Sequence, residues 1–369
     1  MKKRLVYTVV SILMILAIVG LIWNSSLVNH NSEENKIVRL LGWVGYEEED
    51  LVKEFEEQTG YTLKVKTFFG ADKMFAMLSQ EPSAYDVVVI DPEYIKKLYE
   101  AGLIQPIAEK TLDFSHYYEE FKHFEPCYID NKLQTVIVRF GALGLVYNTD
   151  HVSADEISSF SKLLNPKFKN RLGMYDWYLP NMGLISLKQG NTAPYSISSS
   201  QFENLEQDLL QLKPQIRKVH GGVLSLLSSV ESGDIWIVMA GGEWMTALLK
   251  PKNVPIDWIV PKEGGLIWFE TLGLSSQAKN IKGAMELIRF LQSPKGQHLL
   301  MKRKAYNSLA PSRTAIQMLN EEERQLRHIQ TDQAFHELVK KLTPRALPVH
   351  QSERDWQNVW NKFKSANPE

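Results

Sequence analysis

The chain has 369 residues, and its 42 basic and 43 acidic side chains give a formal net charge of −1. Because no basic stripe interrupts this balance, nucleic acid is excluded as the main partner. The single cysteine, Cys127, excludes an internal disulfide framework and a cysteine-based zinc site. Beyond its amino-terminal segment the chain is too long for one ordinary domain and fits two.

The amino-terminal segment has the pattern of an export signal. Lys2, Lys3 and Arg4 precede an uncharged, mostly apolar run over residues 5–23. This run is longer than the ~7–15 residues of a cleaved signal core and close to the ~20 residues of a membrane-spanning helix. A cleaved signal peptide and an uncleaved signal anchor both remain open, and residues 1–36 comprise this segment plus a polar linker. Either way, we expect the remaining chain outside the inner membrane, in the periplasm or tethered to the membrane.

From Ile37 onward, strand and helix patterns alternate, which predicts an α/β fold with crossover helices. Short β-branched runs predict strands, and apolar residues at helical spacing predict helices. The main expected strands are 37–41, 63–67, 87–90, 140–148 and 234–239, and the main expected helices are 47–58, 202–212, 281–291, 335–342 and 356–363. We expect the last two helices to pack on the second domain.

Two strand ends carry candidate ligand-binding residues, because ligands in open α/β sheets bind beyond the carboxyl ends of strands. Trp43 and Tyr46 follow the first predicted strand, and Asp91 and Glu93 follow the strand 87–90. We interpret Asp91 as the cap of a helix that begins at Pro92. For Glu93, a ligand contact and a purely structural role both remain open.

The stretch 257–274 contains the strongest local pattern in the chain. Two apolar runs flank the turn Pro-Lys-Glu-Gly-Gly at 261–265, which predicts two strands and a turn. Since side chains alternate along a strand, Trp268 and Glu270 share one face. An indole beside a carboxylate suits an organic ammonium group. The alternative is a tryptophan buried for its area and a solvated glutamate.

This stretch resembles the second interdomain crossover of the spermidine/putrescine-binding proteins of ABC importers, a group of extracellular solute-binding proteins. The resemblance covers most of the chain after about residue 37. Matching segments occur at 41–46, 85–89, 144–148, 165–169 and 287–294. It implies a two-domain type II periplasmic-binding-protein fold with hinge crossovers, in which each domain is a mixed sheet flanked by helices. Its domain 1 would comprise 37–143 and 262–312, and its domain 2 would comprise 144–261 and 313–369.

The resemblance also implies a function: a solute-binding subunit that binds a polyamine between its domains and delivers it to the permease subunits of an ABC importer. No catalysis, cofactor or metal is implied, and we expect a monomer. Trp268 and Glu270 would hold an ammonium group, and aromatic side chains would form the walls of the cleft. The full set of expected ligand contacts is Trp43, Tyr46, Glu93, Asp176, Trp177, Met239, Trp268, Glu270 and Tyr306.

The chain departs from the family pattern where the family uses a pair of acids to hold an amine. Asp176 remains, whereas Trp177 and Pro180 stand near the positions of that pair, and Glu270 replaces the usual aspartate. Fewer carboxylates predict weaker holding of several separated cations, or a ligand with one cationic centre. Met239 stands where the family usually has an aromatic side chain, and it could supply an adaptable apolar contact. Gly241-Gly242 would let the backbone approach a ligand closely.

Two alternatives remain open. Some transferases of this fold, the thiaminase-like ones among them, use a cysteine nucleophile, and Cys127 has His123 as the nearby base. The other alternative is a membrane-tethered sensor that binds a different small cation.

Overall fold

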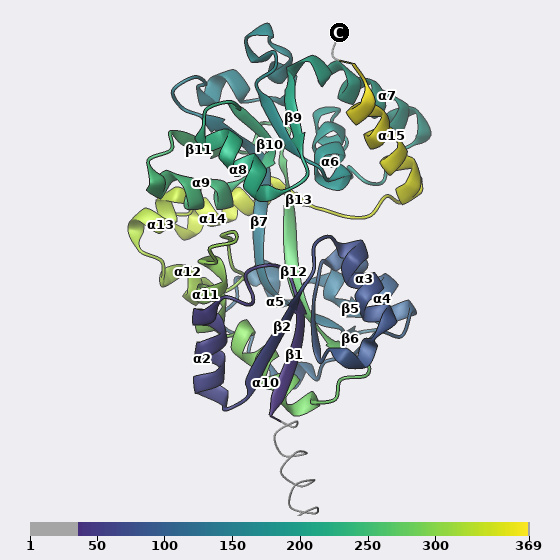
Figure 1. Ribbon diagram of the computed structural model, residues 1–369, viewed down its shortest axis with the longest axis vertical. Helices are drawn as coiled ribbons and strands as arrows, with labels where there is room; N and C mark the ends of the chain where they lie inside the picture. The colour runs from purple at the N-terminus through teal and green to yellow at the C-terminus, as the bar shows by residue number, and fades with distance from the viewer. Residues whose placement is uncertain (1–35, 368–369) are drawn as a thin grey trace, which may run out of the picture.

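The computed structural model describes residues 36–367. Two lobes are joined by two long strands, β7 (Thr135–Asn148) and β12 (Gly265–Ser275), which run between them side by side (Figure 1). These strands pair antiparallel, from Leu266 opposite Leu143 to Gly273 opposite Thr135. Every residue of both strands is buried, so both lobes cover the pair.

The first lobe, drawn at the bottom of Figure 1, is built on three parallel strands, β2 (Thr62–Thr67), β1 (Ile37–Gly42) and β3 (Val87–Ile90). β12 lies antiparallel beside β3. All four residues of β3 are buried, as expected for a central parallel strand made of Val and Ile. The helices of this lobe include α2 (Glu49–Thr59), α3 (Ala71–Gln80), α4 (Ile95–Glu100), α10 (Ile281–Gln292) and α11 (Pro294–Met301).

The second lobe repeats this arrangement. Three parallel strands, β9 (Ile216–His220), β8 (Leu172–Tyr175) and β10 (Ile237–Gly241), are followed by β7, which is antiparallel to β10. β11 (Ile256–Ile259) pairs with the other side of β7. The helices of this lobe include α6 (Tyr178–Lys188), α7 (Ser199–Gln211), α8 (Val223–Glu231) and α9 (Glu243–Leu249). The predicted α/β class, with a mixed sheet in each half and two crossover strands, is confirmed.

The turn between β11 and β12 also matches its prediction. Gly264 adopts the left-handed region with φ of +100°, which favours glycine at this position. Glu263 is held by Ser159 and by the backbone N–H of Phe160 at 3.3 Å. β12 therefore begins at a fixed point, Gly265, and this sets which of its side chains face the interior.

The carboxyl-terminal segments return to the region between the lobes. β13 (Leu342–Pro344) pairs in parallel with the start of β12. α15 (Glu353–Ser365) packs on α6 and α7, as expected. α14 (Asp332–Lys340) differs, because its Phe335 stacks on Tyr118 with ring centroids 3.9 Å apart and also contacts Phe121. Tyr118 and Phe121 both precede the first crossover strand, β7, in the chain. The helix α14 therefore packs against the first-lobe side of the hinge.

The remaining short elements are β4 (Ile104–Gln105), α5 (Glu119–Lys122), β5 (Tyr128–Ile129), β6 (Lys132–Leu133), α12 (Arg313–Gln317) and α13 (Glu321–Leu326). Within residues 36–367, no helix combines the length and the apolar character that a membrane span requires. The predicted signal or anchor at residues 5–23 lies outside the described residues.

Candidate ligand-binding site

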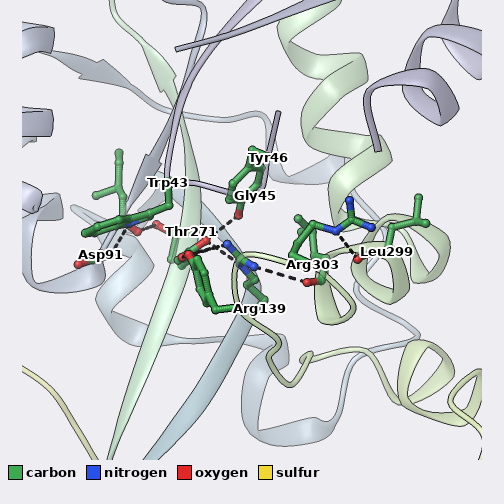
Figure 2. A network of polar contacts seen from close by, with 12 residues as sticks. Trp43, Gly45, Tyr46, Asp91, Arg139, Thr271, Leu299 and Arg303 are labelled. Carbon is green, nitrogen blue, oxygen red and sulfur yellow. Dashed lines mark hydrogen bonds and ion pairs between the residues drawn. The ribbon is translucent and has the colours of Figure 1, made fainter. Parts of the chain in front are cut away.

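Strand pairing places Arg139 of β7 directly opposite Glu270 of β12. Nε of Arg139 donates to Oε2 of Glu270 at 2.7 Å, and Nη2 donates to Oε1 at 3.3 Å. The hydroxyl of Tyr46 donates to Oε2 at 2.8 Å, and the hydroxyl of Tyr306 donates to Oε1. These four side chains form the Arg139 cluster, and Figure 2 shows Tyr46 and Arg139 within it.

The Arg139 cluster is satisfied internally. Both charged side chains are almost fully buried, and a buried ion pair persists only when each charge is paired and hydrogen-bonded. The two oxygens of Glu270 accept four hydrogen bonds, which is about the capacity of a carboxylate. Burial raises the pKa values of Tyr46 and Tyr306 well above the ordinary value, so both remain donors. A ligand ammonium can therefore reach Glu270 only if one of these partners moves.

Trp268 lies next to the Arg139 cluster. Its ring meets that of Tyr306 edge-on, with centroids 5.9 Å apart. Ile267 and Phe269 belong to the other hydrophobic core, as the alternation along the strand predicts. A β-bulge follows Glu270, between it and Thr271. Such bulges re-aim side chains at functional sites, and this one lies at the hinge between the lobes.

A second charged group lies where β3 ends. Arg345, which directly follows β13, donates from Nε to Oε1 of Glu93 at 2.5 Å and from Nη2 to Oδ2 of Asp91 at 2.9 Å. Its backbone N–H donates to the carbonyl of Ile267 in β12 at 3.0 Å. Arg345 is therefore held to the hinge through its backbone and to the first lobe through its guanidinium.

Two tryptophans complete this group. Nε1 of Trp43 donates to Oδ1 of Asp91 at 3.3 Å, as Figure 2 shows, and the guanidinium of Arg345 lies 4.2 Å from the ring of Trp177. The two indole rings have centroids 6.5 Å apart. We call Trp43, Asp91, Glu93, Trp177 and Arg345 the Arg345 cluster. Since Trp43 belongs to the first lobe and Trp177 to the second, this cluster spans the boundary between the lobes.

The Arg345 cluster contains one guanidinium and two buried carboxylates. Burial raises the pKa of Asp91 to about 8; Arg345 opposes this shift, and the charges of Glu93 and Glu270 add to it. Among the residues that the structure describes, Oε2 of Glu93 accepts no hydrogen bond, whereas the other three carboxylate oxygens do. The interpretation of Asp91 as a helix cap is wrong, because its side chain makes no capping bond and pairs with Arg345 instead.

Two of the expected ligand contacts lie away from both clusters. Asp176 accepts from Nε1 of Trp360 at 2.7 Å and from Nζ of Lys364 at 2.9 Å, which ties the end of β8 to α15. Met239 is fully buried in the core of the second lobe. The other seven expected contacts are members of the two clusters or, for Trp268, adjoin one of them.

Sequence reasoning missed the two arginines around which both clusters form. Arg139 is the only charged residue in the run 135–144, and a lone charge in a buried strand signals a buried partner. Arg345 carries no such signal, because it lies in the irregular stretch Leu-Thr-Pro-Arg-Ala-Leu-Pro.

Glu243 begins α9 and is another fully buried carboxylate. Its Oε2 accepts from the backbone N–H of Ala142 at 2.9 Å, while its Oε1 has no hydrogen-bond partner within the described part of the chain. Burial raises the pKa of Glu243 to about 8. The neighbouring Gly242 lies against β7, since a Cβ there would come within 2.0 Å of the carbonyl oxygen of Ala142. The double glycine was expected to let the backbone approach a ligand. In the structure, Gly242 instead lets the backbone approach the crossover strand β7.

Cys127 has the surroundings of an inert thiol. It is buried, and burial raises its pKa to about 12, whereas a nucleophilic cysteine needs a lowered pKa. His123 is directed to Glu125, with Nε2 and Oε1 3.1 Å apart. This geometry gives no support to a cysteine-dependent transferase.

Comparison with known proteins adds sequence relatives of similar length. The spermidine/putrescine-binding periplasmic protein of Escherichia coli (strain K12) is 26% identical over 271 residues, which cover 72% of this chain and 75% of that protein. The putrescine/agmatine-binding protein of Pseudomonas aeruginosa is 22% identical over 364 residues, which cover 89% of this chain and 92% of that protein.

Solved structures share the fold. The spermidine/putrescine ABC transporter substrate-binding protein PotD from Streptococcus pneumoniae has a TM-score of 0.73 at 20% identity, covering 89% of this chain and 98% of that one. The expected fold of two-domain periplasmic binding proteins is thus confirmed. The sequence profile of the bacterial extracellular solute-binding proteins matches residues 50–332, more than half of the chain. The chain therefore belongs to the bacterial extracellular solute-binding protein family.

Proposed function

We propose that this protein is the solute-binding subunit of an ABC importer and binds a cationic amine of the polyamine class between its lobes. One observation carries this proposal: the Arg345 cluster holds two carboxylates against one guanidinium, beside two indole rings from opposite lobes. The excess negative charge and the aromatic faces both favour an ammonium group. The relatives named for spermidine and putrescine support the same ligand class.

In the proposed complex, Oε2 of Glu93 is the acceptor for the ligand ammonium, since Arg345 and Trp43 already use the other carboxylate oxygens of the cluster. The rings of Trp43 and Trp177 would contact the amine from opposite lobes. A ligand that touches both lobes favours the closed arrangement, in which the lobes also meet at Lys97 and Glu353, 3.8 Å apart. β7 and β12 would be the hinge between the two domains.

The proposal includes delivery of the bound amine to permease subunits in the inner membrane by a monomeric protein. The residues form no nucleophile and base arrangement at Cys127, so we propose binding without catalysis. We place the lobes in the periplasm, as the names of the relatives indicate for those proteins. Residues 5–23 would direct export or hold the protein at the membrane.

Calorimetry with putrescine and spermidine tests this function directly. We expect binding by the native protein and a loss of roughly 5–30-fold in affinity for Trp43→Ala, because a desolvated cation–π contact contributes about 1–2 kcal/mol. Trp236→Ala is the matched control, since Trp236 stacks on His151 in the second lobe with centroids 4.4 Å apart. The proposal fails if the native protein binds neither these two amines nor the singly charged N-acetylputrescine, or if both tryptophan variants bind as the native protein does.

Amine binding should also tighten as the pH rises from about 6.5 to 8.5. Because the pKa of Asp91 is raised to about 8, part of the protein carries a proton on Asp91 over this range, and that proton must leave before the charged site forms. Ligand amines with a pKa near that of lysine, about 10.4, stay charged throughout. Calorimetry in buffers of different ionisation enthalpy should detect proton release on binding. Asp91→Asn should abolish this release; an unchanged affinity across the range would contradict the prediction.

A further inference from the structure

Arg345 makes the kinds of contact by which proteins hold an organic ammonium group, an aromatic face and paired carboxylates. Its guanidinium lies over an indole ring at 4.2 Å and pairs with two buried carboxylates, and the whole residue is only 7% exposed. We infer that Arg345 is a built-in cation that replaces one ligand ammonium, so that this protein selects polyamine derivatives with a single ammonium group. This inference rests on the proposed function and names the ligand class within it.

The position of Arg345 is fixed by backbone hydrogen bonds to the hinge strand β12. The residue follows β13, which pairs with the start of β12, and its own N–H bonds to Ile267. Against the lowering effect of burial, the charges of Glu93 and Asp91 raise its pKa, so the positive charge is permanent. A ligand therefore meets a site in which one cation is already present.

The net charges of the two clusters determine how many ammonium groups a bound ligand can place there. In the Arg139 cluster, Arg139 and Glu270 cancel each other. In the Arg345 cluster, once Asp91 has released its proton on ligand binding, Asp91 and Glu93 contribute −2 and Arg345 contributes +1, which leaves −1. One ammonium group neutralises this remainder, whereas a second buried ammonium would be unpaired.

The other charges near these clusters do not change that count. Glu243 is bonded to β7 through the N–H of Ala142, and the positive charge of Arg327 opposes the raised pKa of Glu243. Asp176, the remaining acid expected at the site, is paired with Lys364. Glu353, which lies across the boundary between the lobes, is paired with Lys97, so the carboxylates that contact the guanidinium of Arg345 are Asp91 and Glu93.

Calorimetry with amines of rising charge tests this inference. N-acetylputrescine carries one ammonium group, putrescine two and spermidine three. We expect the native protein to bind N-acetylputrescine at least tenfold more tightly than putrescine, and putrescine more tightly than spermidine. Arg345→Gln should shift the putrescine to N-acetylputrescine affinity ratio by at least tenfold toward putrescine, because it removes the built-in cation. Arg345→Lys keeps the charge and should keep the native ratio.

The putrescine to N-acetylputrescine affinity ratio separates the role of Arg345 as a built-in cation from a purely structural role. A general loss of packing would lower the affinities for all amines together. If Arg345→Gln does not fold by circular dichroism, Glu93→Gln decides the question: it removes a carboxylate and should shift the ratio at least fivefold in the opposite direction. An unchanged ratio in the variant that folds overturns the inference, as does a lysine variant that behaves like the glutamine variant. If the native protein binds no amine of the series, the proposed function itself fails.

Discussion

Replacing Arg139 with methionine is expected to lower the free energy of unfolding by about 3–5 kcal/mol, because it leaves the carboxylate of Glu270 buried without its counter-ion. Glu270 is only 3% exposed and receives two of its four hydrogen bonds from Arg139. The hydroxyls of Tyr46 and Tyr306 would remain as donors but carry no charge. Urea denaturation at pH 7 measures the loss.

The control for this experiment is an ion pair at the surface. Arg217 donates to Asp234 at 3.0 Å, and the side chains of both residues are about two-fifths exposed. Arg217→Met should therefore cost less than about 1 kcal/mol. The double variant Arg139→Met, Glu270→Gln should recover much of the lost stability, since it buries no unpaired charge. Equal losses for the two arginine variants would contradict the assignment of a buried, internally paired cluster.

Replacing Glu243 with glutamine is expected to stabilise the protein at pH 8.5 and to leave its stability nearly unchanged at pH 5. The pKa of this buried carboxyl is raised from 4.5 to about 8 in the folded protein. Between these values the folded state keeps a proton that the unfolded state has released, so stability falls as the pH rises through this window. At about 1.4 kcal/mol for each pKa unit, the whole window is worth at most roughly 5 kcal/mol.

Glutamine has the shape of the protonated side chain, and its carbonyl can still accept from the N–H of Ala142. Because Asp91 titrates over the same range, the quantity to follow is the difference in unfolding free energy between the native protein and the variant. Glu57→Gln, at an exposed glutamate of α2, is the matched control and should show little difference at either pH. A difference for Glu243→Gln that stays constant from pH 5 to pH 8.5 would refute the prediction.

The sequence by itself determined the architecture. The run Val87–Ile90 predicts a buried strand because β-branched side chains pack well on a sheet covered on both faces. The acidic residues at the start of α2 and Gly60 at its end, with φ of 71°, define a helix through local backbone chemistry alone. The turn 261–265 located the second crossover and, by alternation, the shared face of Trp268 and Glu270. Such signals depend on neighbours within a few residues.

Only the tertiary structure decided how the charges of the candidate site are paired. Arg139 and Glu270 are 131 residues apart in the chain, and Arg345 and Asp91 are 254 residues apart. Each pair forms because two crossover strands and the segment after β13 meet at the hinge, and no local pattern specifies that meeting. The sequence therefore indicated which acidic and aromatic residues gather between the lobes, whereas the three-dimensional pairing determined how much of their charge is left for a ligand.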